Sequence, residues 1–121
     1  MGKNNELGRR GEQTAADFLL QKGYVIRDKN WHFERAELDI VALQGDMWVF
    51  VEVKTRSTNY FGYPEQAITP SKQRLLAKAA AAYVEQHHIE GNIRFDVIAI
   101  TFTKDLPDIL HIEDAFFIYD T

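Results

Sequence analysis

The stretch that decides the fold is AELDIVALQGDMWVFVEVKTR, residues 36–56. Its two halves alternate with period two, and they flank Gln44-Gly45-Asp46, which has the composition of a turn. The pattern predicts two antiparallel strands, at about 37–43 and 47–55, joined by a tight hairpin. If Gly45-Asp46 is a two-residue loop, Gln44 faces Met47 and the residue numbers of every cross-strand pair sum to 91.

That register places Asp39 opposite Glu52 and Glu37 opposite Lys54. Opposed side chains on one sheet face have Cβ atoms about 4.5–5.5 Å apart. Two carboxylates at that distance repel each other unless one is protonated or a cation lies between them. Lys54 emerges on the same face as Glu52 because the strand period is two. The spacing therefore predicts a cation-binding carboxylate pair beside an ammonium group, although a loop of three or five residues would break the register.

Oxygen ligands of this kind suit Mg²⁺ or Mn²⁺. Such an ion would polarise a scissile phosphate and acidify a bound water, and Lys54 would orient that water or stabilise charge on the phosphoryl oxygens. The alternative is a cluster of salt bridges on a solvated sheet face. The apolar alternate face of the second strand, formed by Val49, Val51 and Val53, favours the site.

The rest of the chain supplies helices and further strands. Gly23 is a natural stop for a first helix, and Thr69 followed by Pro70 is a good start for a second one. The expected elements outside the hairpin are a helix from Asn4 or Asn5 to about Lys22, a short strand that starts at 24–26, a helix from Pro70 to about His88, a strand at 93–102 and a last strand within 109–119. The order αβββαββ predicts an α/β fold with a mixed central sheet flanked by helices.

Glu12 is a further candidate because it lies near the apolar face of the first helix. A glutamate there is costly unless it is paired or binds a metal. A partner among Arg9, Arg10 or a backbone amide at the helix start explains it equally well.

The composition of the 121 residues limits the class of protein. The length fits one domain, 1–121, and 45% hydrophobic residues allow a real core. The absence of cysteine excludes disulfides and thiolate zinc sites. With no signal-peptide pattern and no apolar run of about 20 residues, a cytoplasmic protein without a membrane span is expected.

The net charge of −4 is unevenly distributed. Segment 36–53 has a net charge of −4, and it lies between segments 1–35 and 54–78, which have +2 and +4. This pattern suits a metal site flanked by a phosphate-binding surface, although ordinary surface charge is the alternative. The candidate nucleic-acid contacts are Arg9, Arg10, Arg35, Arg56, Lys72 and Arg74. Tyr60, Phe61 and Tyr63 could stack on unpaired bases, but packing against the body is favoured.

Several motifs together resemble the bacterial YraN-like family. They are Gly8-Arg-Arg-Gly-Glu12, Ala36-Glu-Leu-Asp39, Val49-Phe-Val-Glu-Val-Lys-Thr-Arg56, Lys72 with its helix, and Arg94-Phe-Asp-Val97. That family is similar to the Holliday-junction resolvases and other enzymes of the PD-(D/E)xK type. The resemblance implies a restriction-endonuclease-like fold in which Asp39, Glu52 and the Val53 carbonyl bind the metal. It also implies that Lys54 is the catalytic lysine and Glu12 an accessory acid.

The sequence thus favours a Mg²⁺- or Mn²⁺-dependent endonuclease acting on DNA, with branched or structured DNA as a candidate substrate. A two-fold homodimer would suit two symmetric cuts, although no residue pattern encodes it. One alternative is a nucleic-acid-binding module of the same fold that does not cleave. Another is a protein-interaction domain that uses the acidic C-terminal third.

Overall fold

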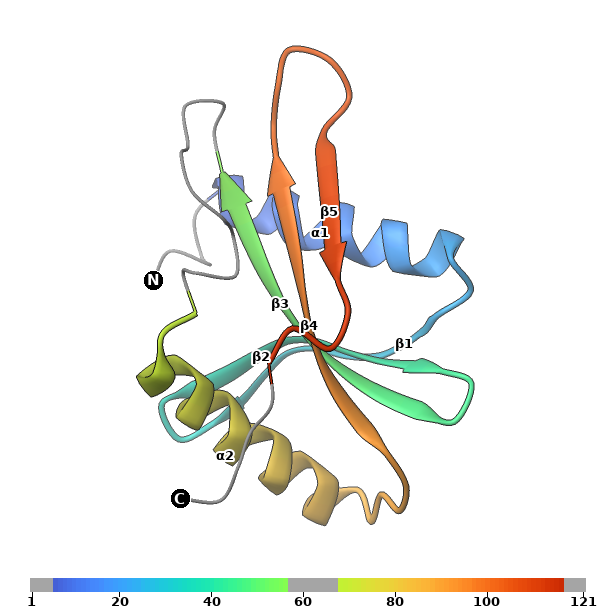
Figure 1. The fold of residues 1–121 in the computed structure, drawn as a ribbon, viewed down its shortest axis with the longest axis vertical. Helices are drawn as coiled ribbons and strands as arrows, with labels where there is room; N and C mark the ends of the chain where they lie inside the picture. The colour runs from blue at the N-terminus through green and yellow to red at the C-terminus, as the bar shows by residue number, and fades with distance from the viewer. Residues whose placement is uncertain (1–5, 57–67, 117–121) are drawn as a thin grey trace.

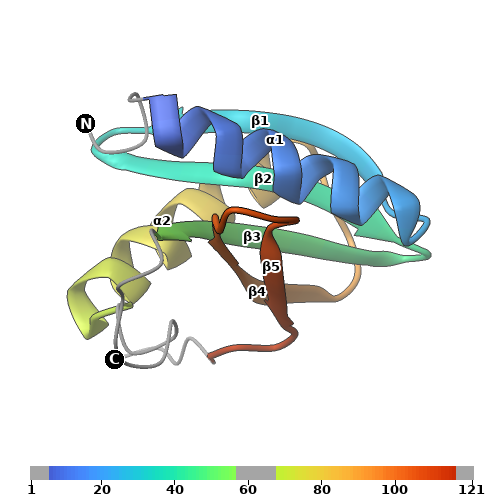
Figure 2. The ribbon, with the colours of Figure 1, turned by 90° about the horizontal axis from the view of Figure 1, so that it is seen from above.

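The computed structural model describes residues 6–56 and 68–116, which form a five-stranded mixed sheet with one helix on each face (Figures 1 and 2). The elements, in chain order, are α1 (Glu6–Gln21), β1 (Val25–Phe33), β2 (Ala36–Gln44), β3 (Met47–Arg56), α2 (Pro70–Gln86), β4 (Ile93–Thr101) and β5 (Asp108–Ile112). This order and the α/β class are those that the sequence predicts.

Both helices end or begin at the expected signals. Gly23 follows α1 with a φ of 92°, a left-handed conformation that glycine adopts without steric cost. At the start of α2, the side chain of Thr69 accepts a hydrogen bond of 3.1 Å from the backbone N–H of Lys72, and Pro70 occupies the first turn. The predicted caps Asn4 and Asn5 lie outside the described residues.

The strands follow one another across the sheet in the order β1-β2-β3-β4-β5. The pairs β1–β2, β2–β3 and β4–β5 are antiparallel, whereas β3 and β4 are parallel. The parallel pair follows from the connection, because α2 lies between β3 and β4 in the chain and returns it to the same end of the sheet.

The prediction of a short first strand was wrong, since β1 is nine residues long. It pairs with β2 on one side only and is an edge of the sheet. Arg27, Asp28 and Lys29 interrupt the apolar alternation by which a strand is recognised, and the register shifts between Ile26 and Asp28. Pairing with β2 overrides this weak local signal.

Two apolar clusters fill the two faces of the sheet. Leu19 of α1 packs with Val51 and Ile98 on one face, and Leu76 of α2 packs with Phe50 and Val97 on the other. The sheet is thus covered on both sides, as Figure 2 shows. Within the described part of the chain, neither helix has the length and apolar character that crossing a membrane requires.

Candidate active site

The predicted hairpin register is confirmed from the turn to the pair of Ile40 and Val51, and the strands separate beyond that pair. Gln44 faces Met47, and the same register continues to Ile40 opposite Val51. Beyond that pair the two strands diverge, which Figure 1 shows clearly. The predicted pairing of Asp39 with Glu52 is therefore wrong as a ladder position. We call this divergence of β2 and β3 the fork.

The side chain of Asp39 accounts for the fork. Its Oδ2 accepts a hydrogen bond of 2.8 Å from the backbone N–H of Val53. A carboxylate thus takes the place of a carbonyl in the ladder, which satisfies the strand N–H group while the two backbones separate. The Asp39 side chain is buried, with 1% of its surface exposed. The fork therefore brings Asp39 directly against the strand that carries Glu52.

Glu52 lies at the fork on the face covered by α2. It is 2% exposed, and its Oε2 lies 3.8 Å from Nζ of Lys54 and 3.7 Å from Nζ of Lys72. Lys54 is the predicted neighbour two residues along β3. Lys72, a predicted nucleic-acid contact, comes from the first turn of α2 and lies beside the candidate catalytic carboxylate. Both distances exceed those of a short charge-assisted hydrogen bond, about 2.7–2.9 Å.

Glu12 lies on α1, which covers the face of the sheet opposite Glu52. Its side chain is 5% exposed, and its Oε1 accepts a hydrogen bond of 2.8 Å from Nδ2 of Asn30 on β1. The predicted alternatives for Glu12 were an arginine or a helix-start amide, so this partner was missed. The same Nδ2 donates to Oε2 of Glu37 at 3.0 Å. The prediction that Glu37 faces Lys54 is wrong, because the pairing of β2 with β3 ends at Ile40 and Val51, and Glu37 pairs only with His32 of β1.

A close approach of α1 to β3 holds Glu12 in place. Gly11 is buried, and a Cβ atom there would lie 3.1 Å from Cβ and Cγ2 of Thr55 and would collide with its Oγ1. Only glycine allows the helix to lie this close to the strand. Thr55 and Lys54 point to opposite faces of β3, so the contact fixes α1, and with it Glu12, against the face of β3 opposite Lys54.

The donor set fits a hard divalent cation. Of the expected ligands, Asp39 and Glu52 would supply carboxylates and Val53 a backbone carbonyl, and Mg²⁺ is usually bound by one or two carboxylates, water and a substrate phosphate. No cluster of three or more His, Asp or Glu residues arranged to hold a metal occurs in residues 6–56 and 68–116. A cage made by the protein alone is therefore not formed by these residues, and water and phosphate would complete the coordination.

The predicted basic contacts are distributed unequally around the fork. The guanidinium of Arg10 lies 4.3 Å from the ring centroid of Phe102, whose N–H donates to the carbonyl of Arg56 at 3.1 Å. Arg10 and the backbone of Arg56 thus both contact Phe102, beyond Lys54 at the C-terminal end of β3. Arg9, Arg35 and Arg74 are exposed, with Arg9 3.3 Å from Glu6 and Arg74 3.3 Å from Ser71. Tyr60, Phe61 and Tyr63 lie outside the described residues.

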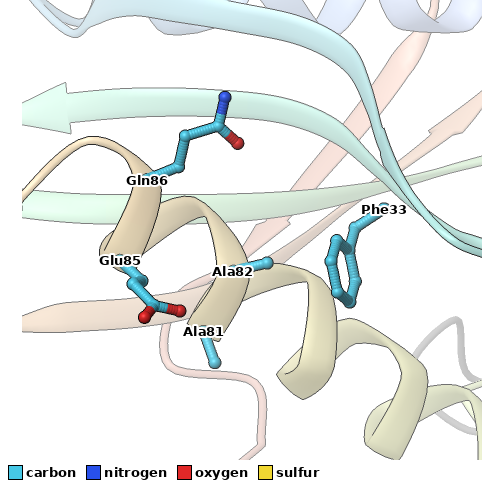
Figure 3. Close-up of a pocket in the computed structure, with 5 residues that line it drawn as sticks. All are labelled: Phe33, Ala81, Ala82, Glu85 and Gln86. Carbon is cyan, nitrogen blue, oxygen red and sulfur yellow. The ribbon is translucent and has the colours of Figure 1, made fainter.

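A separate hollow lies between the end of β1 and α2 (Figure 3). The ring of Phe33 points toward α2 there, and the other lining residues are Ala81, Ala82, Glu85 and Gln86. One carboxylate among apolar and amide groups does not form a site for a divalent cation. This hollow therefore adds nothing to the chemistry of the fork.

A fourth buried carboxylate, that of Asp96 on β4, lies on the face covered by α1. Arg94 donates to it from Nε at 2.8 Å and from a terminal nitrogen at 2.9 Å, and His111 Nε2 is 2.7 Å away. The backbone N–H of Asp114 donates to it at 3.0 Å. Burial alone would raise the pKa of Asp96, but these hydrogen bonds outweigh it and hold the pKa below its usual range. Asp96 therefore joins β4, β5 and the chain that follows β5.

Comparison with known proteins assigns the chain to a family. Residues 11–100 match the model described as Uncharacterised protein family UPF0102. The chain belongs to the UPF0102 family. The matched residues include Glu12, Asp39, Glu52, Lys54 and Lys72, so the fork lies within the region that the family model covers.

Individual relatives extend this match over most of the chain. A UPF0102 protein of Geobacter sulfurreducens is 49% identical over 115 residues, which cover 93% of this chain and 90% of the relative. One of Flavobacterium psychrophilum is 44% identical over 97% of this chain and 98% of its own length. One of Christiangramia forsetii is 42% identical over 98% of this chain and its entire own length.

Proposed function

We propose that this UPF0102 protein is a divalent-metal-dependent endonuclease of the PD-(D/E)xK type that hydrolyses phosphodiester bonds of DNA. The observation that carries the proposal is the fork: two buried carboxylates, Asp39 and Glu52, converge there from separate strands with Lys54 and Lys72 beside them. Buried acids and partly exposed lysines at one place are typical of phosphoryl-transfer sites rather than of a packed core.

Asp39, Glu52 and the carbonyl of Val53 would hold Mg²⁺ or Mn²⁺. When bound, the ion would polarise the scissile phosphate and lower the pKa of the attacking water. In hydrolysis a water oxygen bonds to phosphorus, the bond from phosphorus to one ester oxygen breaks, and the leaving oxygen takes up a proton. Asp39 has a fixed orientation for this role because its Oδ2 is held by the N–H of Val53.

The lysines supply positive charge where negative charge develops. Lys54 and Lys72 are about a quarter and a third exposed, so their ammonium groups can reach a phosphate that lies against Glu52. Lys54 would stabilise charge on the phosphoryl oxygens, which is worth about 10²–10³ in rate for one such donor. Lys72 would neutralise the same phosphate from the side of α2, and Glu12 would act as an accessory acid from the side of α1.

DNA would leave the fork along the end of β3, where Arg10 and Arg56 lie beyond Lys54. Contacts from these residues to backbone phosphates would position the strand without reading its sequence. Structured or branched DNA is the proposed substrate class, and a two-fold homodimer would allow paired cuts.

The experiment is cleavage of end-labelled duplex, single-stranded, flapped and four-way-junction DNA in Mg²⁺, Mn²⁺ or EDTA. The proposal predicts metal-dependent cuts that disappear in Asp39→Ala and in Lys54→Ala, while the exposed-surface variant Gln13→Ala cleaves like the wild type. Full cleavage by folded Asp39→Ala would exclude the proposed site. Metal-independent DNA binding without any cleavage would instead favour the non-cleaving module.

A further inference from the structure

We propose that Asn30 is a positioning residue of this site, which holds the carboxylate of Glu12 at the fork; the inference rests on the proposed function. Asn30 lies on the edge strand β1, which is longer than the short strand predicted from the sequence. Its side chain nevertheless connects two elements, because Nδ2 donates to Glu12 of α1 and to Glu37 of β2. Figure 2 shows how α1 lies along β1, which makes this bridge possible.

The type of bridge matters as much as its place. One neutral amide nitrogen has two hydrogens, and here they satisfy one oxygen each of two carboxylates, at 2.8 and 3.0 Å. A lysine in this place would neutralise those carboxylates. Asparagine orients them and leaves both negative charges intact. An uncharged donor that orients carboxylates in this way suits groups that act on a cation.

The backbone of Asn30 is also adapted to this place. Its φ is 53°, in the left-handed region, which interrupts a regular strand and is uncommon for residues other than glycine. Asparagine tolerates it best among residues that carry an amide donor. The flanking pairs, Lys29 with Ile40 and Trp31 with Leu38, place Asn30 across the sheet from Asp39.

A row of polar groups therefore crosses the molecule at one level. It runs from Glu12 on α1 through Asn30 on β1 and Asp39 on β2 to the N–H of Val53 on β3. The inference takes the accessory acid Glu12 to act on the metal ion together with Asp39 and Glu52, and removing a neighbour that orients such a carboxylate typically changes metal affinity or activity by about 10–100-fold. Asn30 does not need to touch DNA to have such an effect.

The test compares Asn30→Gly, Glu12→Gln and the double variant with the wild type. Glycine keeps the left-handed backbone and removes the amide. Glu34→Gly is the matched control, since Glu34 also has a left-handed φ, 56°, and its side chain forms an exposed ion pair with Lys78. The readouts are the Mn²⁺ dissociation constant from calorimetry, kcat and KM for the DNA that the wild type cleaves, and the melting temperature.

We expect Asn30→Gly to weaken Mn²⁺ binding and lower kcat by about 10-fold or more, with KM and the melting temperature little changed. In the Glu12→Gln background it should add almost nothing, because both changes remove the same positioned carboxylate. Glu34→Gly should match the wild type. An active wild type whose Mn²⁺ affinity and kcat are unaffected by Asn30→Gly, or fully additive effects, would overturn this inference alone. A wild type that neither binds Mn²⁺ nor cleaves DNA would overturn it together with the proposed function.

Discussion

Glu52 and Asp96 are both buried carboxylates on neighbouring strands, yet they are held in opposite ways. Asp96 is 0% exposed and receives hydrogen bonds from Arg94, His111 and a backbone amide at 2.7–3.0 Å. Glu52 is 2% exposed, and the two lysines beside it are 3.7 and 3.8 Å away. The hydrogen-bonded network of Asp96 is expected to stabilise the fold, whereas the proposed function assigns the charge of Glu52 to a metal ion. Burial alone would not distinguish the two.

Replacing Asp96 should give the largest loss of stability. Asp96→Asn leaves Arg94 buried with a carboxamide in place of its counter-ion, and removing one partner of a buried ion pair costs about 3–5 kcal/mol of the free energy of unfolding. Urea unfolding at neutral pH measures this. Because the pKa of Asp96 is lowered in the folded protein, its contribution is present above the unfolded value and is lost as the pH falls through the lower folded one. The difference between wild type and variant should therefore shrink below about pH 3.9, and a constant difference would contradict the assignment.

Replacing Glu52 should give the opposite result. Glu52→Gln should lower the cleavage rate by about 10²–10³-fold, because it removes a charge from the proposed metal site. Its free energy of unfolding should stay the same or rise, since Lys54 and Lys72 can turn to solvent once the buried charge is gone. A Glu52→Gln variant that is strongly destabilised and still cleaves would show that Glu52, like Asp96, serves stability rather than catalysis.

Disturbing the contact between Gly11 and Thr55 should change the free energy of unfolding by less than the replacement of Asp96 does. Gly11→Ala improves helix propensity by about 1 kcal/mol, but the methyl group meets Thr55, so we expect a net loss of about 1–2 kcal/mol. Cleavage should fall too, because α1 carries Glu12. Thr55→Ala in the same chain removes two of the three contacted atoms and should restore part of the stability. Equal stability of Gly11→Ala and wild type would show that α1 has room to move.

The smallest expected loss of stability comes from replacing Tyr83 of α2. Its hydroxyl makes a polar contact with Asp28 that belongs to neither the Glu52 nor the Asp96 network. Burial, with the hydrogen bond of its hydroxyl to Asp28, raises the pKa of Tyr83 to about 12. The wild type should therefore lose stability as the pH rises from 10.0 to about 12, since the unfolded chain ionises first. Tyr83→Phe should cost about 1 kcal/mol at neutral pH and show less of this alkaline loss. The same alkaline loss in both proteins would assign it to other groups.

The sequence predicted the part of the fold that depends on local chemistry. The order of elements, the helix signals at Gly23 and Thr69, and the hairpin register from Gln44 to Ile40 follow from turn residues and periodicity. The register failed from Asp39 onward because a side chain, rather than the next carbonyl, accepts the N–H of Val53. Pattern alone does not reveal such a substitution.

The residues of the candidate site that lie on the hairpin could be predicted from the sequence, whereas the neighbours that other elements contribute could not. Asp39, Glu52 and Lys54 lie on adjacent strands, so their proximity follows from the hairpin. Lys72 was expected to contact DNA, and its place beside Glu52 depends on how α2 packs. Asn30 left one weak signal, an asparagine in an otherwise extended stretch, because its partner Glu12 is 18 residues away in the chain.

The measurement that tests the central claim most directly is calorimetric titration of Mn²⁺ into wild type, Glu52→Gln and Glu113→Gln. Glu113 is an exposed acid 3.7 Å from Arg94, so it controls for loss of one carboxylate near the Asp96 network. We predict saturable binding to the wild type and to Glu113→Gln, and binding at least about tenfold weaker to Glu52→Gln. Equal binding to all three proteins, or none to the folded wild type, would contradict the claim that the charge of Glu52 is kept for a metal ion.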